Sequence, residues 1–420
     1  MTANVGRWTR DAGRCIILAF IMALHFLVFG NHPRLSLAEF LAFKPKAKIV
    51  SQTPNTCIVE MNDWQADVLM SQLGGVIKLG DVILESKGTD LKAADIAQLA
   101  SGKQEMTGLE FGWTSFGGNG KEKKIFEKYP LHIKRALKEL GWKIRWVSGE
   151  GGQPLSPAAV AKCHLTEQPN ADFCLMLDKG KTFLGRTTQV QDADAWSLRD
   201  YGRPCRDDIN GMLPPKLARM MVNLAQTPDG GTLLDPFCGS GTILMEAALA
   251  TSETKIIGSD IDERQTDDTS GNLEWLLNKN ILSQDDETRF KVFTSDVKEV
   301  GHYLSPKSID AVVTEGWLGP ALRGRESLSE IQKNASQITQ LWKDALAALK
   351  PLMKKDGRIV AIFPSYKVGS QIIATDSDID FASLGFALED LPANLRQMDM
   401  YYERTGQHLR RNVRILKTGN

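Results

Sequence analysis

The stretch Leu233-Leu-Asp-Pro-Phe-Cys-Gly-Ser-Gly-Thr-Ile-Leu-Met-Glu-Ala-Ala248 decides the fold of this 420-residue chain. Its two leucines predict the end of a buried strand, with Asp235 at the tip. Gly239 and Gly241 predict a turn in which the backbone passes close to a ligand, because glycine has no Cβ. A helix is expected over Thr242–Ala250, with its first free N–H groups facing the same ligand. Together these signals predict a binding site at the carboxyl end of a strand.

The glycine turn suits a small ligand with a carboxylate at one end and a ribose at the other, and S-adenosylmethionine is such a molecule. A dinucleotide site would carry G-x-G-x-x-G, but Leu244 stands where the third glycine would be. A phosphate-binding P-loop needs a lysine after the glycine, and here Thr242 follows Gly241. A strand, turn and helix with a purely structural role is the alternative.

The full sequence Asp-Pro-Phe-Cys-Gly-Ser-Gly-Thr at 235–242 indicates a protein family more specifically than its two glycines alone. It resembles the first motif of the class I methyltransferases that methylate exocyclic amino groups of nucleic-acid bases. This resemblance implies S-adenosylmethionine as the cofactor. The contacts that it implies within this motif are Asp235, Pro236, Phe237, Gly239, Gly241 and Thr242.

The next predicted strand, Lys255–Asp260, also ends in an acid. Ligands of open α/β sheets bind outside the carboxyl ends of the strands. A carboxylate at this tip can accept hydrogen bonds from both ribose hydroxyls, so we assign that role to Asp260, with Asp262 as second choice. Ile261 lies between them and is assigned to the same cofactor site. The alternative for Asp262 is the N-cap of a helix that begins near Glu263.

A third strand is predicted over Phe290–Asp296, again with an acid at its end. Asp296 resembles the family residue that accepts a hydrogen bond from the adenine amino group. A surface turn is the alternative.

The fourth strand, Ile309–Thr314, runs into Glu315-Gly-Trp-Leu-Gly-Pro320, which is the predicted catalytic loop. An exocyclic amine attacks a methyl-sulfonium poorly, because its lone pair is delocalised into the base. Oxygen acceptors that hold its N–H bonds favour a pyramidal nitrogen and place it in line with the methyl group. We assign the acid to Glu315, the second acceptor to the Gly316 carbonyl and the ring that stacks on the base to Trp317.

This loop departs from the family pattern, which is Asp or Asn, Pro, Pro, then Tyr or Phe. Glu315 is one methylene longer than Asp, both prolines are missing, and Leu318 stands at the aromatic position. Proline would stiffen the loop, whereas Gly316 predicts a looser one. Altered or degenerate catalysis is therefore an alternative to a working amine site.

The segment before the first motif narrows the resemblance. This segment contains three short motifs: Arg-Asp-Tyr-Gly-Arg-Pro at 199–204, Leu-Pro-Pro-Lys-Leu-Ala-Arg at 213–219 and Asn-Leu-Ala at 223–225. They resemble THUMP-containing tRNA guanine-N2 methyltransferases, which modify guanosine 10 of tRNA. The resemblance implies that Pro214, Pro215 and Lys216 help to close the cofactor site. It also places Arg199, Arg203 and Arg206 near the RNA backbone or the loop over the cofactor, with an exposed basic linker as the alternative.

The first half of the chain has a different order of elements. Strands are predicted at 26–30, 80–85 and 143–147, helices at 36–42 and 129–140, and a hairpin at 171–190 that turns at Lys179-Gly180. This order resembles the ferredoxin-like and THUMP modules that precede the methyltransferase domain in the same tRNA family.

Charge supports an RNA surface locally. Basic residues outnumber acidic ones from Lys121 to Arg145, and Trp113, Tyr129, Trp142 and Trp146 are interleaved with them. Such a surface attracts phosphates through counterion release, and a solvated helix face is the alternative. Because the chain has 51 basic and 51 acidic residues, any RNA contact must come from local patches.

We predict an α/β fold in which a Rossmann-like class I methyltransferase domain follows an α+β, ferredoxin-like and THUMP-like region. Alternating strand and helix signals in the second half favour one doubly wound domain. The predicted divisions are an extension at 1–25, the α+β region at 26–190, a linker at 191–213 and the methyltransferase domain at 214–420.

The N-terminus and the cysteines bear on compartment and metal. Ile16–Phe29 is almost wholly apolar and follows Arg7, Arg10 and Arg14, which is typical of a signal peptide. The run is short for a membrane span, and cleavage would damage the strand at 26–30. We therefore predict a cytoplasmic protein with no membrane association, a secretory or anchoring role being the alternative. The six scattered cysteines contain no C-x-x-C pair, so neither a zinc site nor a disulfide framework is indicated.

The predicted function is S-adenosylmethionine-dependent methylation of an exocyclic base amine in RNA, with guanine N2 of tRNA as the leading substrate. The transfer is predicted to be direct and in line, without a metal or a covalent enzyme intermediate. Two alternatives stay open. A DNA amino-methyltransferase would share the cofactor motif but carry a target-recognition insert, and a tRNA-binding protein would carry an impaired Glu315–Trp317 loop.

Overall fold

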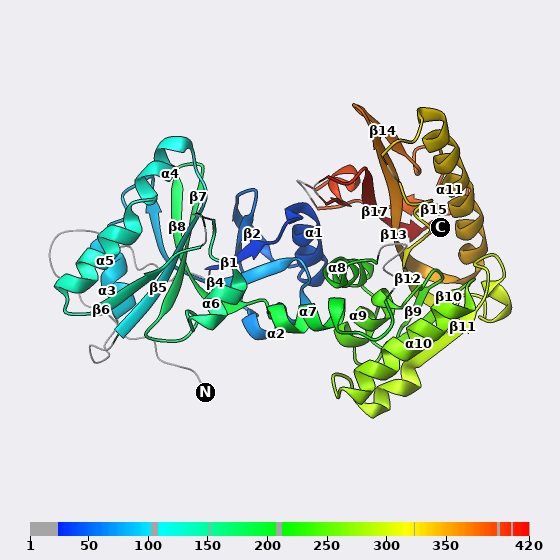
Figure 1. Cartoon of the computed structure of the whole chain (residues 1–420), viewed down its shortest axis with the longest axis horizontal. Coiled ribbons are helices and arrows are strands. Elements are labelled where there is room, and N and C mark those ends of the chain that lie inside the picture. The colour runs from blue at the N-terminus through cyan, green and yellow to red at the C-terminus, as the bar shows by residue number, and fades with distance from the viewer. Residues whose placement is uncertain are drawn as a thin grey trace.

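The computed structural model describes residues 24–101, 108–149, 151, 153–206, 212–322, 324–392, 395–404 and 406–419. They form two lobes, each built on one β-sheet, with helix α8 (Pro215–Ala225) between them (Figure 1). Most of the predicted N-terminal extension lies outside the described residues. Its last two positions, Leu24 and His25, begin the first strand.

The N-terminal lobe is a mixed sheet with helices packed against it. In sheet order its strands are β2 (Lys48–Gln52), β3 (Thr56–Glu60), β1 (Leu24–Phe29), β4 (Val76–Lys87), β8 (Lys181–Val190), β7 (Ala171–Asp178), β5 (Gly108–Gly117) and β6 (Lys143–Val147). Its helices are α1 (Pro33–Phe43), α2 (Ala66–Gln72), α3 (Ala93–Ser101), α4 (Gly120–Phe126), α5 (Tyr129–Glu139) and α6 (Pro157–Lys162). Pairing is antiparallel from β2 to β7, and β5 and β6 continue in parallel to β7.

The predicted elements of this lobe are present, with one difference in length. The predicted strand at 80–85 is only the centre of β4, which extends from Val76 to Lys87 because it pairs with β1 on one side and β8 on the other. The expected interleaving of aromatic and basic side chains is wrong for two residues. Tyr129 and Trp142 are buried in the core under α5, so they are not surface rings among the lysines.

The C-terminal lobe is a mostly parallel sheet covered on both faces. In sheet order its strands are β11 (Phe290–Thr294), β10 (Lys255–Asp260), β9 (Thr232–Asp235), β12 (Ile309–Glu315), β13 (Met353–Val368), β17 (Leu409–Thr418) and β15 (Phe386–Leu388). The first five are parallel, and β17 is antiparallel to β13 and β15. Two short strands complete it, β14 (Gln371–Ala374) beside β13 and β16 (Tyr401–Tyr402) beside β17.

The central strands β9 and β12 are mainly apolar because both faces of the sheet are buried there. Consecutive side chains point to opposite faces: Leu233 packs in the cluster shared by α8, α9 (Thr242–Ala250) and α10 (Glu263–Asn278). Leu234 packs in the cluster on the other face, under α11 (Leu328–Leu349). Both leucines are fully buried. The predicted doubly wound α/β domain is therefore confirmed.

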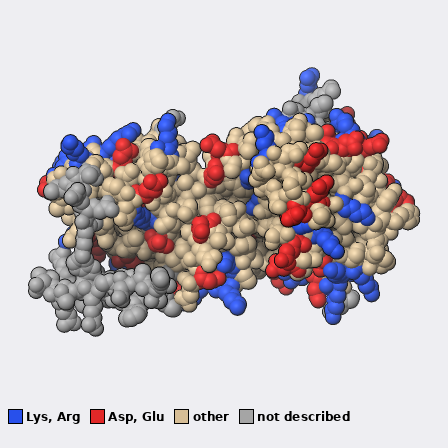
Figure 2. All heavy atoms as spheres, turned by 90° about the horizontal axis from the view of Figure 1, so that it is seen from below, with Lys and Arg blue, Asp and Glu red and all other residues tan. Residues whose placement is uncertain are grey.

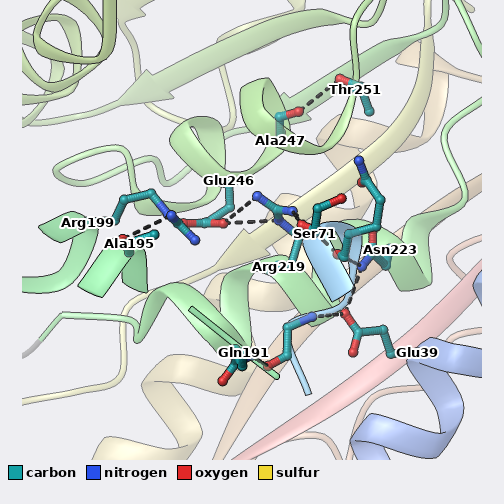
Figure 3. Close-up of polar contacts among 12 residues, drawn as sticks. Glu39, Ser71, Gln191, Ala195, Arg199, Arg219, Asn223, Glu246, Ala247 and Thr251 are labelled. Carbon is teal, nitrogen blue, oxygen red and sulfur yellow. Dashed lines mark hydrogen bonds and ion pairs between the residues drawn. The ribbon is translucent and has the colours of Figure 1, made fainter. Parts of the chain in front are cut away.

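The two lobes share a core and a buried polar network. Residues of α1 and of α8 belong to one hydrophobic cluster. Beside it, the carboxylate of Glu39 accepts hydrogen bonds from the Gly74 and Gly75 amides at 2.7 and 2.8 Å and from Asn223 Nδ2 at 2.7 Å. One turn earlier on α8, the Arg219 guanidinium donates to the Ser71 carbonyl at 3.1 Å (Figure 3). Helix α8 is thus hydrogen-bonded to the N-terminal lobe along one side.

The same arginine reaches the helix that follows the glycine turn. Arg219 Nε lies 3.0 Å from Glu246 Oε2 on α9, and Arg199 Nε lies 2.7 Å from Glu246 Oε1 (Figure 3). Arg199 belongs to α7 (Ala193–Tyr201), a helix that forms within the segment predicted as a linker and begins at Asp192, whose side chain accepts from two amides of the first turn. The segment before the first motif is therefore packed structure.

Candidate active site

The acids predicted at the strand tips lie together at one edge of the sheet. β10, β9 and β12 are adjacent and parallel, so Asp260, Asp235 and Glu315 end neighbouring strands on the same side. The Thr314 hydroxyl of β12 donates to Asp235 Oδ1 at 2.6 Å. The amide of Gly239, in the glycine turn after β9, donates to Asp260 Oδ2 at 3.0 Å. The structure therefore joins three of the predicted residues in one site.

Asp235 is a buried carboxyl group whose charge is poorly compensated. It is 1% exposed and also accepts from the Phe237 amide at 3.1 Å. Burial raises its pKa to about 8, and the hydrogen bonds from Thr314 and Phe237 oppose this rise. The nearby acids Asp260 and Glu315 raise it further. A positively charged ligand group beside Asp235 would reverse that effect.

The glycine turn has the backbone conformation that the sequence predicts. Gly239 and Gly241 have φ angles of +52° and +81°, in the left-handed region where a side chain is strained. A Cβ on Gly241 would lie 2.9 Å from the Thr269 hydroxyl. Pro236 and Phe237 belong to the same turn, and the Cys238 amide is held by the Ser259 carbonyl at 2.9 Å.

Two residues of α10 hold this turn, and sequence reasoning missed both. The Thr269 hydroxyl donates to the Gly239 carbonyl at 2.7 Å, and Asn272 Nδ2 donates to the Ser240 carbonyl at 2.8 Å. Both are buried polar side chains inside a helix. The sequence signal that could have identified them is that Thr269 and Asn272 are polar residues on the same face of α10 as the apolar Leu273 and Leu276.

Asp260 ends β10 beside the glycine turn, and Asp262 has the capping role. Asp260 Oδ1 accepts from the Asp262 amide at 3.1 Å, and burial raises the pKa of this carboxyl. Asp262 is the N-cap of α10, and its side chain accepts from the Arg264 amide. Ile261 is 70% exposed although it is apolar, so its side chain is open to a ring-shaped ligand. The capping alternative for Asp262 is confirmed.

Asp296 lies two residues beyond the end of β11, which is shorter than predicted and stops at Thr294. The carboxylate closes a turn, because Oδ1 accepts from the Lys298 amide at 3.0 Å. Lys298 Nζ lies 3.5 Å from Oδ2 and is about half exposed. The turn that was the alternative for Asp296 is present, and it places the acid at the same edge as Asp260, because β11 neighbours β10.

Glu315 forms an ion pair that the sequence did not predict. Arg411 of β17 places Nε 2.6 Å from Glu315 Oε1, and both side chains are largely buried. Burial raises the pKa of Glu315, while the charge and hydrogen bond of Arg411 lower it. The two residues are 96 positions apart, so nothing local in the sequence connects them.

The predicted catalytic loop is held by close packing and is not loose. Although Gly316 in place of proline predicts a looser loop, a Cβ at this position would lie 2.8 Å from the buried ring of Trp342. The Tyr366 hydroxyl donates to the Leu318 carbonyl at 2.6 Å. Trp317 is 47% exposed, which leaves its ring available for stacking. Close packing on Trp342 and the bond from Tyr366 replace the stiffness that proline would give.

The basic residues before the first motif have partners inside the protein. Arg199 is paired with Glu246, and Arg203 is 3% exposed and donates to the Thr242 hydroxyl at 2.6 Å. Neither contacts solvent in the way a phosphate-binding arginine or an exposed linker would, so those interpretations are wrong for them. Arg203 instead supports the start of α9. The guanidinium of Arg206 lies over the ring of Tyr201 at 5.4 Å.

The residues at the strand tips fit S-adenosylmethionine. In the glycine turn, Gly239 and Gly241 leave the backbone accessible because they have no Cβ. The carboxyl group of Asp235, whose pKa is raised, lies beside this turn. The acid Asp260 and the exposed apolar side chain of Ile261 lie at the end of the next strand. Among the described residues, no group of three or more His, Cys, Asp or Glu is arranged to hold a metal ion. No described helix has the length and apolarity needed to cross a membrane.

Comparison with known proteins agrees with this geometry. The family described as UPF0020, an RMKL-like methyltransferase domain, matches residues 203–301. A tRNA (guanine(10)-N2)-dimethyltransferase of Methanocaldococcus jannaschii is 33% identical over 191 residues, 44% of this chain and 49% of that protein. A probable tRNA (guanine(10)-N2)-dimethyltransferase of Methanothermococcus thermolithotrophicus is 32% identical over 146 residues, 34% of this chain and 77% of that protein.

This chain belongs to the tRNA guanine-N2 methyltransferase family. It spans about half the length of the Methanocaldococcus jannaschii relative. The crystal structure of TrmN from Thermus thermophilus aligns over 94% of this chain and 99% of its own with a TM-score of 0.52, at 16% identity. That likeness extends the shared fold to the N-terminal lobe. The matched family segment ends before Glu315-Gly-Trp, so the role of this loop stays a prediction.

Proposed function

We propose that this chain transfers a methyl group from S-adenosylmethionine to the exocyclic N2 of a guanine in tRNA. The observation that carries the proposal is the juxtaposition of Asp235, Asp260 and Glu315 at the tips of three adjacent parallel strands, beside the glycine turn. The names of the relatives supply the substrate class. The sites at Asp235–Thr242, Asp260–Ile261 and Asp296 are proposed to hold the methionine, ribose and adenine parts of the cofactor.

When bound, S-adenosylmethionine supplies an electrophilic methyl group on a positively charged sulfur. The proposed role of Glu315 is to accept a hydrogen bond from the target amine and to hold the proton that the nitrogen loses when the N–C bond forms. Arg411 Nε occupies Oε1, so we assign Oε2 to the amine. The Gly316 carbonyl is the proposed second acceptor, and the half-exposed ring of Trp317 stacks on the extruded base.

The N-terminal lobe is proposed to bind the body of the RNA. Most of the basic residues of α4 and α5 are exposed, including Lys121, Lys124, Arg135 and Lys138. On the face shown in Figure 2, basic and acidic side chains are interspersed over both lobes, so a local patch and not a global field must attract phosphates. We retain the proposed division into an α+β region at 26–190, a connecting segment at 191–213 that contains α7, and a methyltransferase domain at 214–420.

Methyl transfer from labelled S-adenosylmethionine to different acceptors tests this proposal. The protein is incubated with an unmodified tRNA transcript, with duplex DNA and with no acceptor, and label in the nucleic acid is counted. Label in tRNA alone is expected. Label in duplex DNA would favour a DNA amino-methyltransferase, and tight tRNA binding without label would favour an impaired catalytic loop. Glu315→Ala is expected to lose transfer while binding the cofactor normally.

A further inference from the structure

A cavity of about 440 Å³ lies where the two lobes meet, apart from the cofactor-binding turn. Five segments of the chain line it: residues 30–36 at the start of α1, residues 74–77 at the start of β4, helix α7, residues 214–220 at the start of α8, and Tyr402 of β16 with Arg404. A second cavity of about 740 Å³ adjoins it, because the two share His32, Tyr402 and Arg404. Pro214 and Lys216, expected to close the cofactor site, therefore face this junction.

Gln191 joins two of the residues that line the cavity by hydrogen bonds. Gln191 is 3% exposed, and its Nε2 donates to the Gly74 carbonyl of the N-terminal lobe at 3.1 Å. Its Oε1 accepts from Lys216 Nζ at 2.5 Å. Gly74 and Lys216 both line the cavity and lie against each other, so the Gln191 amide joins the N-terminal lobe to the start of α8 on one side of the cavity. That side is therefore held by hydrogen bonds between the lobes.

Aromatic rings provide much of the lining. Tyr402 stacks at a tilt on His32, with ring centroids 4.2 Å apart. Tyr201 is 65% exposed, and Trp196 forms the deeper wall with the Arg199 guanidinium 4.2 Å from its ring. Burial lowers the pKa of His32, which favours the uncharged form of this ring, although Glu403 opposes the shift. Flat, uncharged faces of this kind accept a stacked base whatever its identity.

The charges of the cavity favour an anion. Among its described lining residues, Lys216 and Arg404 are cationic and Asp200 is the acid. Arg404 is exposed, and its Nε donates to the Tyr402 hydroxyl at 3.2 Å, which holds cation and ring together. The adjoining Glu403 is already paired with Lys367 and Arg410, so it does not cancel this charge.

The cavity is connected to the acceptor loop through the sheet. Tyr402 pairs with Arg411 across β16 and β17, and Arg411 Nε lies 2.6 Å from Glu315 Oε1. Side chains of directly paired residues lie on the same face, about 5 Å apart at Cβ. A nucleotide chain whose target base reaches Glu315 therefore has its next positions over Tyr402.

We infer that this junction cavity binds a single-stranded ribonucleotide adjacent to the target guanine. Its base stacks on Tyr402 or Tyr201, and its phosphate is held by Arg404 and Lys216. The combination of fixed rings with cations is the chemistry that recognises unpaired RNA. Naming RNA as the ligand rests on the proposed function, whereas the cavity and its lining do not.

Equilibrium binding and steady-state kinetics with an unmodified tRNA transcript test this inference on the full chain. The variants are Tyr402→Ala, Arg404→Ala and the conservative Tyr402→Phe. Lys333→Ala, at an exposed lysine of α11, is the matched charge control. Loss of one stacked base is expected to weaken tRNA binding and raise the KM for tRNA by about tenfold, with little change in kcat. Lys333→Ala is expected to stay close to the parent. Tyr402→Phe keeps the ring but loses the hydroxyl that Arg404 contacts, so its KM for tRNA is expected to lie between those of the parent and Tyr402→Ala.

Cofactor affinity, measured by calorimetry, shows whether each variant is folded, and Arg404→Ala removes an exposed side chain that the core does not need. If Tyr402→Ala and Arg404→Ala bind and methylate tRNA as the parent does, the cavity is not a nucleotide site and the inference is overturned, while the proposed function stands. If the parent binds tRNA with the expected dependence on both residues yet transfers no label, the proposed function fails and the inference survives. If the parent neither binds nor methylates tRNA, both are overturned.

Discussion

Glu315 and Arg411 form an ion pair that the sequence did not predict, and this pair supports the proposed role of Glu315 as an acceptor for the amine. Burial alone would favour a protonated carboxyl, which accepts hydrogen bonds poorly from an amine. The guanidinium 2.6 Å away opposes that effect and orients the longer side chain. The departure from the family's Asp or Asn is therefore matched by a cation on β17.

Replacing Arg411 should shift the pH dependence of methyl transfer. In Arg411→Gln the pKa of Glu315 rises, because burial is no longer opposed, so more of the carboxyl is protonated at pH 7. The acidic limb of the kcat profile is expected to move to higher pH, with activity recovering as pH increases. Asp235 lies near Glu315, and its pKa of about 8 keeps it mostly uncharged at pH 7, so it opposes ionisation of Glu315 only at higher pH.

Arg410→Gln is the matched control, since Arg410 pairs with Glu403 instead of Glu315. An acidic limb that stays in place in Arg411→Gln would show that the arginine has only a structural role.

Asp235 predicts a pH dependence of cofactor binding. Its pKa of about 8 in the free protein means that it is mostly protonated at pH 7. A cationic ligand lowers that pKa, so binding should release protons and tighten from pH 6 to pH 8. Calorimetry in buffers of different ionisation enthalpy measures the protons released. Binding by Asp235→Asn should be weaker and independent of pH over this range, and equal proton release from that variant would contradict the assignment.

The same group has a consequence for stability with a definite sign. An unfolded aspartate releases its proton near pH 4, whereas folded Asp235 keeps it until about pH 8. The native state therefore binds more protons between these values, and the free energy of unfolding should fall as pH rises through that window. Glu39, whose pKa burial raises to about 7, acts in the same direction.

At the scale of elements, the sequence predicts the strands and turns that depend on local pattern and misses the contacts between them. β9, β10, β12 and the glycine turn follow from apolar runs that end in acids or glycines. Helix α7 was missed because it is only 9 residues long and its packing depends on Glu246, far along the chain. The role of Arg411 was missed because its partner Glu315 is 96 positions away in the sequence.

Gly316 offers a test of the fixed acceptor loop. In Gly316→Ala the new Cβ would meet the Trp342 ring at 2.8 Å, and the ring is too buried to move away. The loop must then shift, and methyl transfer is expected to fall about 10- to 100-fold, since misplacing a reacting group by about 1 Å has that effect. Gly301→Ala is the control, because a Cβ there lies 4.0 Å from the nearest side chain. Equal activity in the two variants would show that the loop tolerates displacement.

At the scale of the whole molecule, α8 connects the N-terminal lobe to α9, the helix that follows the glycine turn. Arg219 contacts Ser71 of the N-terminal lobe and Glu246 of α9 with 3% of its side chain exposed (Figure 3). Arg219→Met should therefore destabilise both lobes, because removing one partner of a buried ion pair costs about 3–5 kcal/mol. Thermal unfolding measures the loss. Lys44→Ala, which removes an exposed pair with Asp63, should leave the melting temperature unchanged.

If Arg219→Met melts like the parent, or if only one lobe loses stability, α8 does not couple the lobes in the way described.

Mass spectrometry of nucleosides from tRNA incubated with isotopically labelled S-adenosylmethionine tests the central claim most directly. The account predicts labelled N2-methylguanosine with the parent protein and none with Glu315→Ala. Label on a different atom or base, or undiminished N2-methylguanosine from Glu315→Ala, would contradict the assignment of the strand-tip acids to this chemistry.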